Sequence, residues 1–72
     1  MTKLFRDELE KIKKKILSLS SLVEESVEKA VLSLVKNDRS LAEEVIENDH
    51  LIDTLEVEVE EDCLKVMALY QP

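Results

Sequence analysis

Four carboxylates in the second half of the sequence are spaced like members of a single helical face. They follow one another at intervals of four, three and four residues and are Asp49, Asp53, Glu56 and Glu60. Side chains three or four positions apart are neighbours on a helix, and like charges placed there repel by a few tenths of a kcal/mol per pair. The surrounding stretch, 43–62, contains no Lys or Arg. A bound cation or a basic partner would relieve the repulsion, so this acidic row is the candidate functional site.

The chemistry of the acidic row is that of hard oxygen ligands. Carboxylates alone suit Mg, Ca or Mn, or iron with water and bridging oxygens. Two acids four residues apart can share one ion, and four can hold more than one. A solvated acidic face without metal is the simpler interpretation, and composition alone favours it.

A second metal pattern is the Glu-x-x-His pair formed by Glu47 and His50. This pair is the ligand motif of di-iron carboxylate bundles, and Glu25 or Glu28 could stand opposite it. The helical register instead turns Glu47 and His50 away from the apolar seam, whereas bundle ligands point inward. Cys63 is a soft ligand among hard ones, and we expect it to pack rather than bind metal. The chain has no nucleophile beside a base and no phosphate loop, so we expect no enzyme.

Composition predicts an all-α protein. The 72 residues include no Gly, a single Pro at position 72, two aromatic residues and 38% charged residues. The net charge of −7 is uneven, with +2 over 1–36 and −9 over 37–72, which argues against nucleic acid as a partner. There is no apolar run long enough for a membrane span and no signal-peptide core. One cysteine excludes an internal disulfide and fits a reducing compartment, so we expect a cytoplasmic protein.

The first element is predicted as one helix over about 3–36. Its apolar seam alternates at spacings of four and three, as in a coiled coil, and comprises Phe5, Leu9, Ile12, Ile16, Leu19 and Val23. The stripe then drifts, with small residues Ser26 and Ser33 beside it, to Val27, Ala30, Val31 and Leu34. A basic cluster on this helix is interpreted as a solvated face and comprises Lys11, Lys13, Lys14 and Lys15.

A short turn at about 37–39 separates this helix from a second one over about 39–70. Asp38 is a good N-cap for the second helix, and Ser40 with Glu43 offers an alternative capping box. So short a connection predicts an antiparallel two-helix hairpin.

The second helix carries two stripes that could each pack against another helix. The seam comprises Leu41, Val45, Asn48, Ile52, Leu55, Val59, Asp62, Val66 and Leu69. Asn48 would set the register, whereas Asp62 has no evident role. The second stripe is apolar at both ends and acidic in the middle, and comprises Ala42, Ile46, the acidic row, Cys63, Met67 and Tyr70. One partner helix cannot cover both stripes, so we expect two hairpins to associate as a four-helix bundle.

The sequence resembles the PhoU family, chiefly through motifs in the second helix. The resemblance rests on Asp49-x-x-x-Asp53-x-x-Glu56, then Glu60, Cys63-Leu64 and the closing Met67-Ala-Leu-Tyr-Gln-Pro72, with the preceding segment 38–49 also similar. It spans essentially the whole chain. It implies that 1–72 is an N-terminal fragment of a PhoU-like helical repeat, containing the first two of its three helices. The third helix, with the family's other acidic motif, would follow residue 72.

The resemblance also implies a function. PhoU proteins are negative regulators of phosphate uptake and of the phosphate regulon, and they act with the ATPase of the phosphate ABC transporter and a sensor histidine kinase. Their acidic motifs can bind multinuclear clusters of iron or zinc-type metals, which would make the acidic row a set of metal ligands. The alternative is a structural hairpin that oligomerises without metal.

Overall fold

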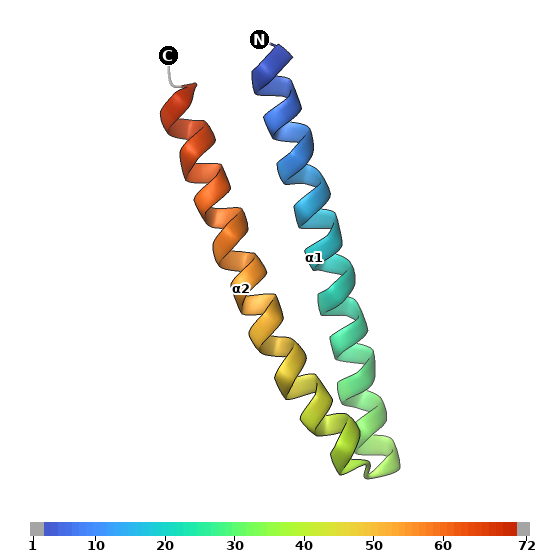
Figure 1. Ribbon diagram of the computed structural model, residues 1–72. Helices are drawn as coiled ribbons and strands as arrows, with labels where there is room; N and C mark the ends of the chain where they lie inside the picture. The colour runs from blue at the N-terminus through green and yellow to red at the C-terminus, as the bar shows by residue number, and fades with distance from the viewer. Residues whose placement is uncertain (1–2, 71–72) are drawn as a thin grey trace.

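The computed structural model describes residues 3–70, which form two α-helices joined by a tight turn. Helix α1 spans Lys3–Lys36 and helix α2 spans Arg39–Leu69 (Figure 1). The helices are antiparallel, so both ends of the described chain lie at the same end of the molecule. The all-α hairpin predicted from the sequence is confirmed. Helix α2 ends one residue before the expected end at Tyr70.

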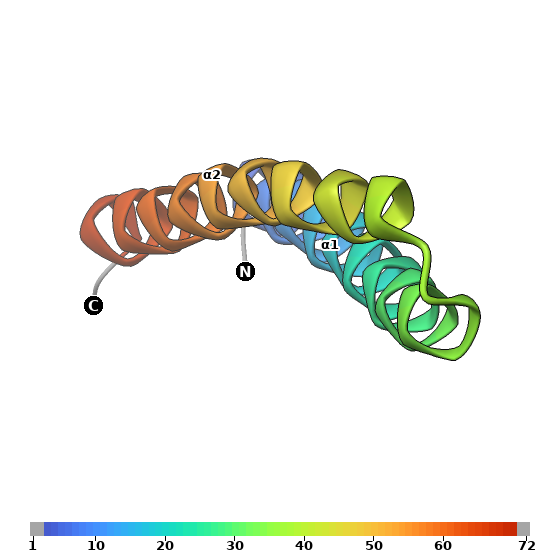
Figure 2. The ribbon, with the colours of Figure 1, turned by 90° about the horizontal axis from the view of Figure 1, so that it is seen from below.

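The hairpin is long and narrow, with extents of 53 × 15 × 13 Å. The helices are close together at the turn and diverge toward their free ends (Figure 1). The view along the molecule shows that they also cross at an angle (Figure 2). The two backbones are therefore closest at the turn and farthest apart at the free ends.

The turn closes because Asn37 accepts a left-handed backbone conformation, with φ of 51°. Asn tolerates this region better than most residues other than Gly. The amide of Asp38 donates to the carbonyl of Ser33 at 2.9 Å, and that of Asn37 donates to Leu34 at 3.3 Å. This pair of bonds is the Schellman motif, which satisfies two carbonyls at the end of α1. A sequence without glycine can therefore still reverse direction within two residues.

Asp38 then begins α2 as its N-cap. Its backbone is extended, and its side chain accepts a hydrogen bond from the amide of Leu41 at 3.0 Å. The alternative cap at Ser40 is not used, because Ser40 already lies inside α2. One turn residue thus ends α1 and the next starts α2.

The core is the seam between the helices, and α2 supplies its seam much as expected. Ile52 and Val66 are buried, and the other predicted seam residues are half-buried except for Leu69, which is 75% exposed. Ile12 is the corresponding buried apolar residue of α1. The core is one side chain deep, because a single helix pair has no second layer.

The predicted seam of α1 is confirmed only in part, because Leu9, Ile16 and Val23 are 40–43% exposed, and the drift expected after Val23 continues to the end of the helix. Val27, Val31 and Leu34 are exposed, and small residues face α2 instead: Ser33 is buried, and its hydroxyl donates to the carbonyl of Ala30 at 2.7 Å. An α-helix has 3.6 residues per turn, so its contact face shifts by about 20° per heptad relative to a repeat of 3.5. Over the length of α1, this drift turns the apolar stripe out of the interface.

The cap can be tested by replacing Asp38→Ala. We expect the free energy of unfolding to fall by about 1 kcal/mol, because the Leu41 amide loses its acceptor. Urea unfolding followed by circular dichroism measures the loss. The matched control is Ser40→Ala, which should change stability by less than about 0.5 kcal/mol. Equal losses of stability in the two variants would show that Asp38 is not the residue that caps α2.

Candidate functional site

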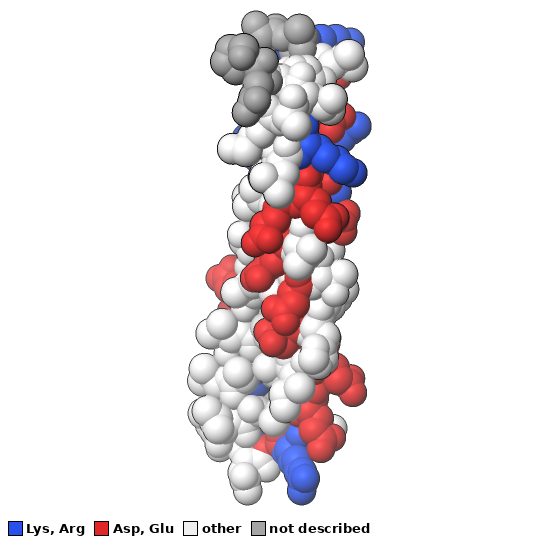
Figure 3. Space-filling view, turned by 90° about the vertical axis from the view of Figure 1, so that its left-hand side faces the viewer, with Lys and Arg blue, Asp and Glu red and all other residues white. Residues whose placement is uncertain are grey.

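All four members of the acidic row are exposed along α2. Figure 3 shows acidic side chains gathered in a band over the middle of the molecule, with a broad uncharged area to its lower left. Asp49 and Glu56 border an open groove of about 250 Å³ between the two helices. The α1 side of that groove is apolar and includes Val23, Val27 and Ala30. The acidic row therefore lies beside a mainly hydrophobic part of α1 that contributes no basic side chain to this groove.

Within residues 3–70, no ion pair involves any member of the acidic row. In the same part of the chain, no three His, Cys, Asp or Glu side chains are grouped closely enough to hold a metal ion. The row runs along the helix axis instead of converging on a point. It can offer an ion carboxylates from successive turns, and the remaining ligands of a cluster would have to come from beyond this hairpin.

The alternative ligand pair, Glu47 and His50, is also exposed. Both lie on the side of α2 that the register turns away from α1, as expected. Of the two acids considered opposite them, Glu25 instead pairs with Lys29 at 3.4 Å. The described residues therefore do not bring these ligands together.

Two lysines of α1 reach across to acids of α2 on the other edge of the hairpin. Lys15 contacts Glu58 at 2.8 Å and Asp62 at 2.6 Å, and Lys29 contacts Glu44 at 3.0 Å. Glu58 lies two residues from Glu60, which places it about 200° around the helix. The lysines therefore neutralise the edge opposite the acidic row.

These contacts raise the pKa of both lysines above the ordinary value. For Lys15 the main cause is the hydrogen bond to Asp62, followed by that to Glu58. For Lys29 the bond to Glu44 comes first, followed by that to Glu25. Sequence reasoning missed both contacts: Lys15 was assigned to a solvated cluster, and Asp62 had no role. The signal in the sequence for the Lys15 contact was Asp62 itself, an acid in a mostly apolar seam, which favours a base on the facing helix.

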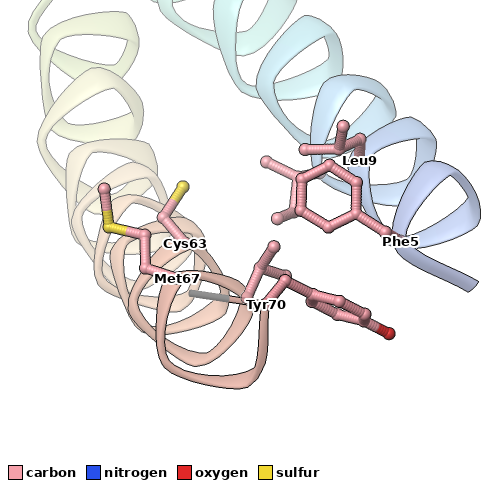
Figure 4. A pocket seen from close by; sticks show the side chains of 7 residues that line it. Phe5, Leu9, Cys63, Met67 and Tyr70 are labelled. Carbon is pink, nitrogen blue, oxygen red and sulfur yellow. The ribbon is translucent and has the colours of Figure 1, made fainter. Parts of the chain in front are cut away.

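The open end of the hairpin holds an apolar groove of about 530 Å³. Figure 4 shows Phe5 and Leu9 from α1 on one side of it, and Cys63 and Met67 from α2 on the other. The rings of Phe5 and Tyr70 meet edge to face, with centroids 4.9 Å apart and planes at 74°. Cys63 and Tyr70 are half-buried here, whereas Met67 is 63% exposed. The apolar end of the second stripe is thus only partly covered by α1.

Neither helix is long and apolar enough, over the described residues, to cross a membrane.

Comparison with known proteins places the similarity over nearly the whole chain. The model of the PhoU domain matches residues 16–72. A phosphate-specific transport system accessory protein PhoU homolog of Aquifex aeolicus is 47% identical over 97% of this chain and 31% of its own length. PhoU homolog 2 of Thermotoga maritima is 33% identical over 100% of this chain and 31% of its own. The phosphate-specific transport system accessory protein PhoU of Escherichia coli K12 is 32% identical over 94% of this chain and 28% of its own length.

The chain therefore spans less than a third of the length of these curated relatives. No solved structure matches it.

The contact of Lys15 predicts an alkaline transition in stability. A raised pKa in the folded state means that the contribution of Lys15 is complete below its unfolded value of 10.5 and is lost as the pH rises through the folded pKa. The stability difference between the wild type and Lys15→Gln should therefore be constant at neutral pH and shrink above about pH 10.5. Urea unfolding from pH 7 to 11.5 measures it.

The matched control is Lys14→Gln, because Lys14 makes no ion pair within the described chain. Its stability difference should stay near zero throughout. If the stability difference depended on pH in the same way for both variants, the contact of Lys15 with Glu58 and Asp62 would not contribute to stability in solution.

Proposed function

The chain belongs to the PhoU family, and on that premise we propose that it is part of a regulatory protein of phosphate homeostasis. The observation that carries the proposal is the 47% identity over 97% of this chain to a relative named as an accessory protein of the phosphate-specific transport system. Because the chain spans 31% of that relative, the proposed role belongs to a protein of the relative's full length.

The proposed role is negative regulation of phosphate uptake and of the phosphate regulon. The partners would be the ATPase of the phosphate ABC transporter and a sensor histidine kinase. A rigid hairpin 53 Å long that exposes apolar and acidic side chains over much of its surface supports a role in protein contacts. Such a surface is suited to binding other proteins more than to enclosing a small substrate.

We assign Asp49, Asp53, Glu56 and Glu60 as the contribution of this chain to a metal site holding an iron or zinc-type cluster. Support comes from their shared exposed face and from the missing counter-charge among residues 3–70. A bound metal would supply positive charge, remove the repulsion along the row and join α2 to the element that provides the other ligands. The contribution of this chain is to hold carboxylates in line on a rigid helix.

A structural hairpin that associates without metal is the second candidate function. It is favoured by a specific observation, namely the exposure of Val27, Val31 and Leu34 along α1. Neither of these functions needs a catalytic group.

The metal assignment predicts that Asp49→Asn combined with Asp53→Asn removes bound metal from a protein of the relatives' length that includes this chain. Metal per chain, measured by elemental analysis after purification, should fall at least about ten-fold, because the charged ligands are lost. Helicity should not change, and the apo form should gain a few tenths of a kcal/mol for each repulsive pair removed.

The matched control for the metal assignment is Glu47→Gln combined with His50→Gln, which should keep the metal. Full metal content in the Asp49 and Asp53 variant would exclude the row as ligands. Metal lost only from the control variant would favour the di-iron alternative.

The regulatory role predicts a phenotype for the same substitutions. A bacterium whose PhoU protein has the acidic row neutralised should express phosphate-starvation genes in rich phosphate. Reporter expression at equal protein abundance measures this. Normal repression of these genes in that strain would show that metal binding by the acidic row is not needed for regulation.

A further inference from the structure

Four basic side chains in the first half of α1 are exposed and have no ion-pair partner within residues 3–70. They are Lys3, Arg6, Lys13 and Lys14. A helix turns by about 100° per residue, which places all four within an arc of about 100° around α1. This basic strip extends about 17 Å along the helix at 1.5 Å per residue.

The structure divides the lysine cluster that is continuous in the sequence. Lys11 pairs with Glu8 at 3.2 Å, and Lys15 pairs with acids of α2. The other two lysines of that cluster belong to the basic strip. There they share one side of α1 with bases two and three turns earlier in the helix. The strip is therefore a set of charges that the hairpin itself does not use.

The basic strip faces away from the rest of the hairpin. Its centre lies about 150° around α1 from Ile12, which is buried against α2, and about 90° from Leu9, one of the exposed apolar side chains. The third helix that the PhoU resemblance implies would leave the strip uncovered if it packed on those apolar side chains. The strip is therefore outer surface in the hairpin and in such a three-helix repeat.

Two acids reduce the charge of the basic strip without cancelling it. Glu10 lies among the bases, within four residues of three of them, and Asp7 lies at their margin. Neither acid forms an ion pair within the described part of the chain. Four bases and two acids leave a local net charge of +2, whereas the whole chain carries −7. The strip therefore has the opposite sign to the molecule around it.

We propose that the basic strip binds an acidic helical segment of another protein. Arg6 and Lys13 are seven residues apart, which separates them by about 10 Å along the axis of α1. A partner helix with carboxylates seven residues apart presents the same spacing, so two charge pairs can form together. The proposal rests on the charges of α1 alone. It stands or fails independently of the metal and of the proposed function.

The length of the strip favours a short acidic segment over an extended polyanion. Glu24 and Glu28 lie farther along the same side of α1, are exposed, and have no ion pair among residues 3–70. A membrane surface or a long nucleic-acid duplex lying along α1 would meet these acids as well as the bases. A segment of three helical turns meets only the strip, so its charge complementarity is better.

The test is fluorescence anisotropy with a fluorescein-labelled helical peptide and a protein of the relatives' length that includes this chain. The peptide consists of three alanine-based heptads with two glutamates in each, and its control has glutamine at those positions. At low salt, we expect the glutamate peptide to bind at least about ten-fold more tightly than the glutamine peptide. This difference should shrink as added salt screens the charges.

Three variants locate the binding surface. Arg6→Glu combined with Lys13→Glu should weaken binding of the glutamate peptide about ten-fold, because two attractive contacts become repulsive. Glu10→Gln should tighten it about two-fold, because an acid among the bases is removed. The matched control, Lys36→Glu combined with Lys65→Glu, changes the net charge equally at exposed lysines outside the strip. It should stay within about two-fold of the wild type. Circular dichroism checks that each variant is helical.

Three results would overturn the proposal. Equal affinity for the glutamate and glutamine peptides would show that the strip does not recognise carboxylates. Equal weakening by the strip variant and by the matched control would show attraction to net charge alone. Co-sedimentation of the protein with phosphatidylglycerol vesicles, without binding of the glutamate peptide, would assign the strip to a membrane surface.

Discussion

One helix can cover only one side of another, and this constraint governs the whole molecule. Helix α1 covers the seam of α2 around Ile52 and Val66, which are buried. The acidic middle of the second stripe of α2 and the exposed apolar side chains of α1 are then left uncovered within residues 3–70. They lie next to each other, since Val23 and Val27 line the same groove as Asp49 and Glu56. The exposed surface is therefore a continuous face, apolar on α1 and acidic on α2.

The ion pairs that join the two helices lie on one edge of the hairpin. Lys15 and Lys29 each bind acids of α2, and both do so on the edge away from the acidic row. Their contacts with Glu58, Asp62 and Glu44 hold the helices in register at two heights while leaving this row without a counter-charge. Four carboxylates without an ion pair among residues 3–70 thus lie on the face that is also unpacked. The acidic row differs in this respect from Glu44, Glu58 and Asp62, which pair with lysines of α1.

Local chemistry made much of this fold predictable, whereas contacts between helices were harder to foresee. The Asp38 cap and the seam of α2 follow from residue preferences and periodicity over a few turns. The seam of α1 was predicted only in part because the contact face drifts along a straight helix, so that Ser33 is buried while Val27 and Leu34 are exposed. The partner of Asp62 depends on how far one helix slides along the other, which no local pattern specifies. The exposed position of the acidic row was predictable from its spacing, whereas the metal site proposed for it would draw further ligands from outside residues 3–70.

A face with apolar and acidic parts needs two kinds of partner chemistry. A metal ion supplies charge to Asp49 and Asp53 but does not remove Val27 or Leu34 from water. An apolar helix packed along α1 would bury those side chains but would bring no positive charge to the row. Each of these partners therefore accounts for the part of the exposed face that the other leaves in water. Because the two parts belong to different helices, metal binding and helix packing can occur in the same molecule.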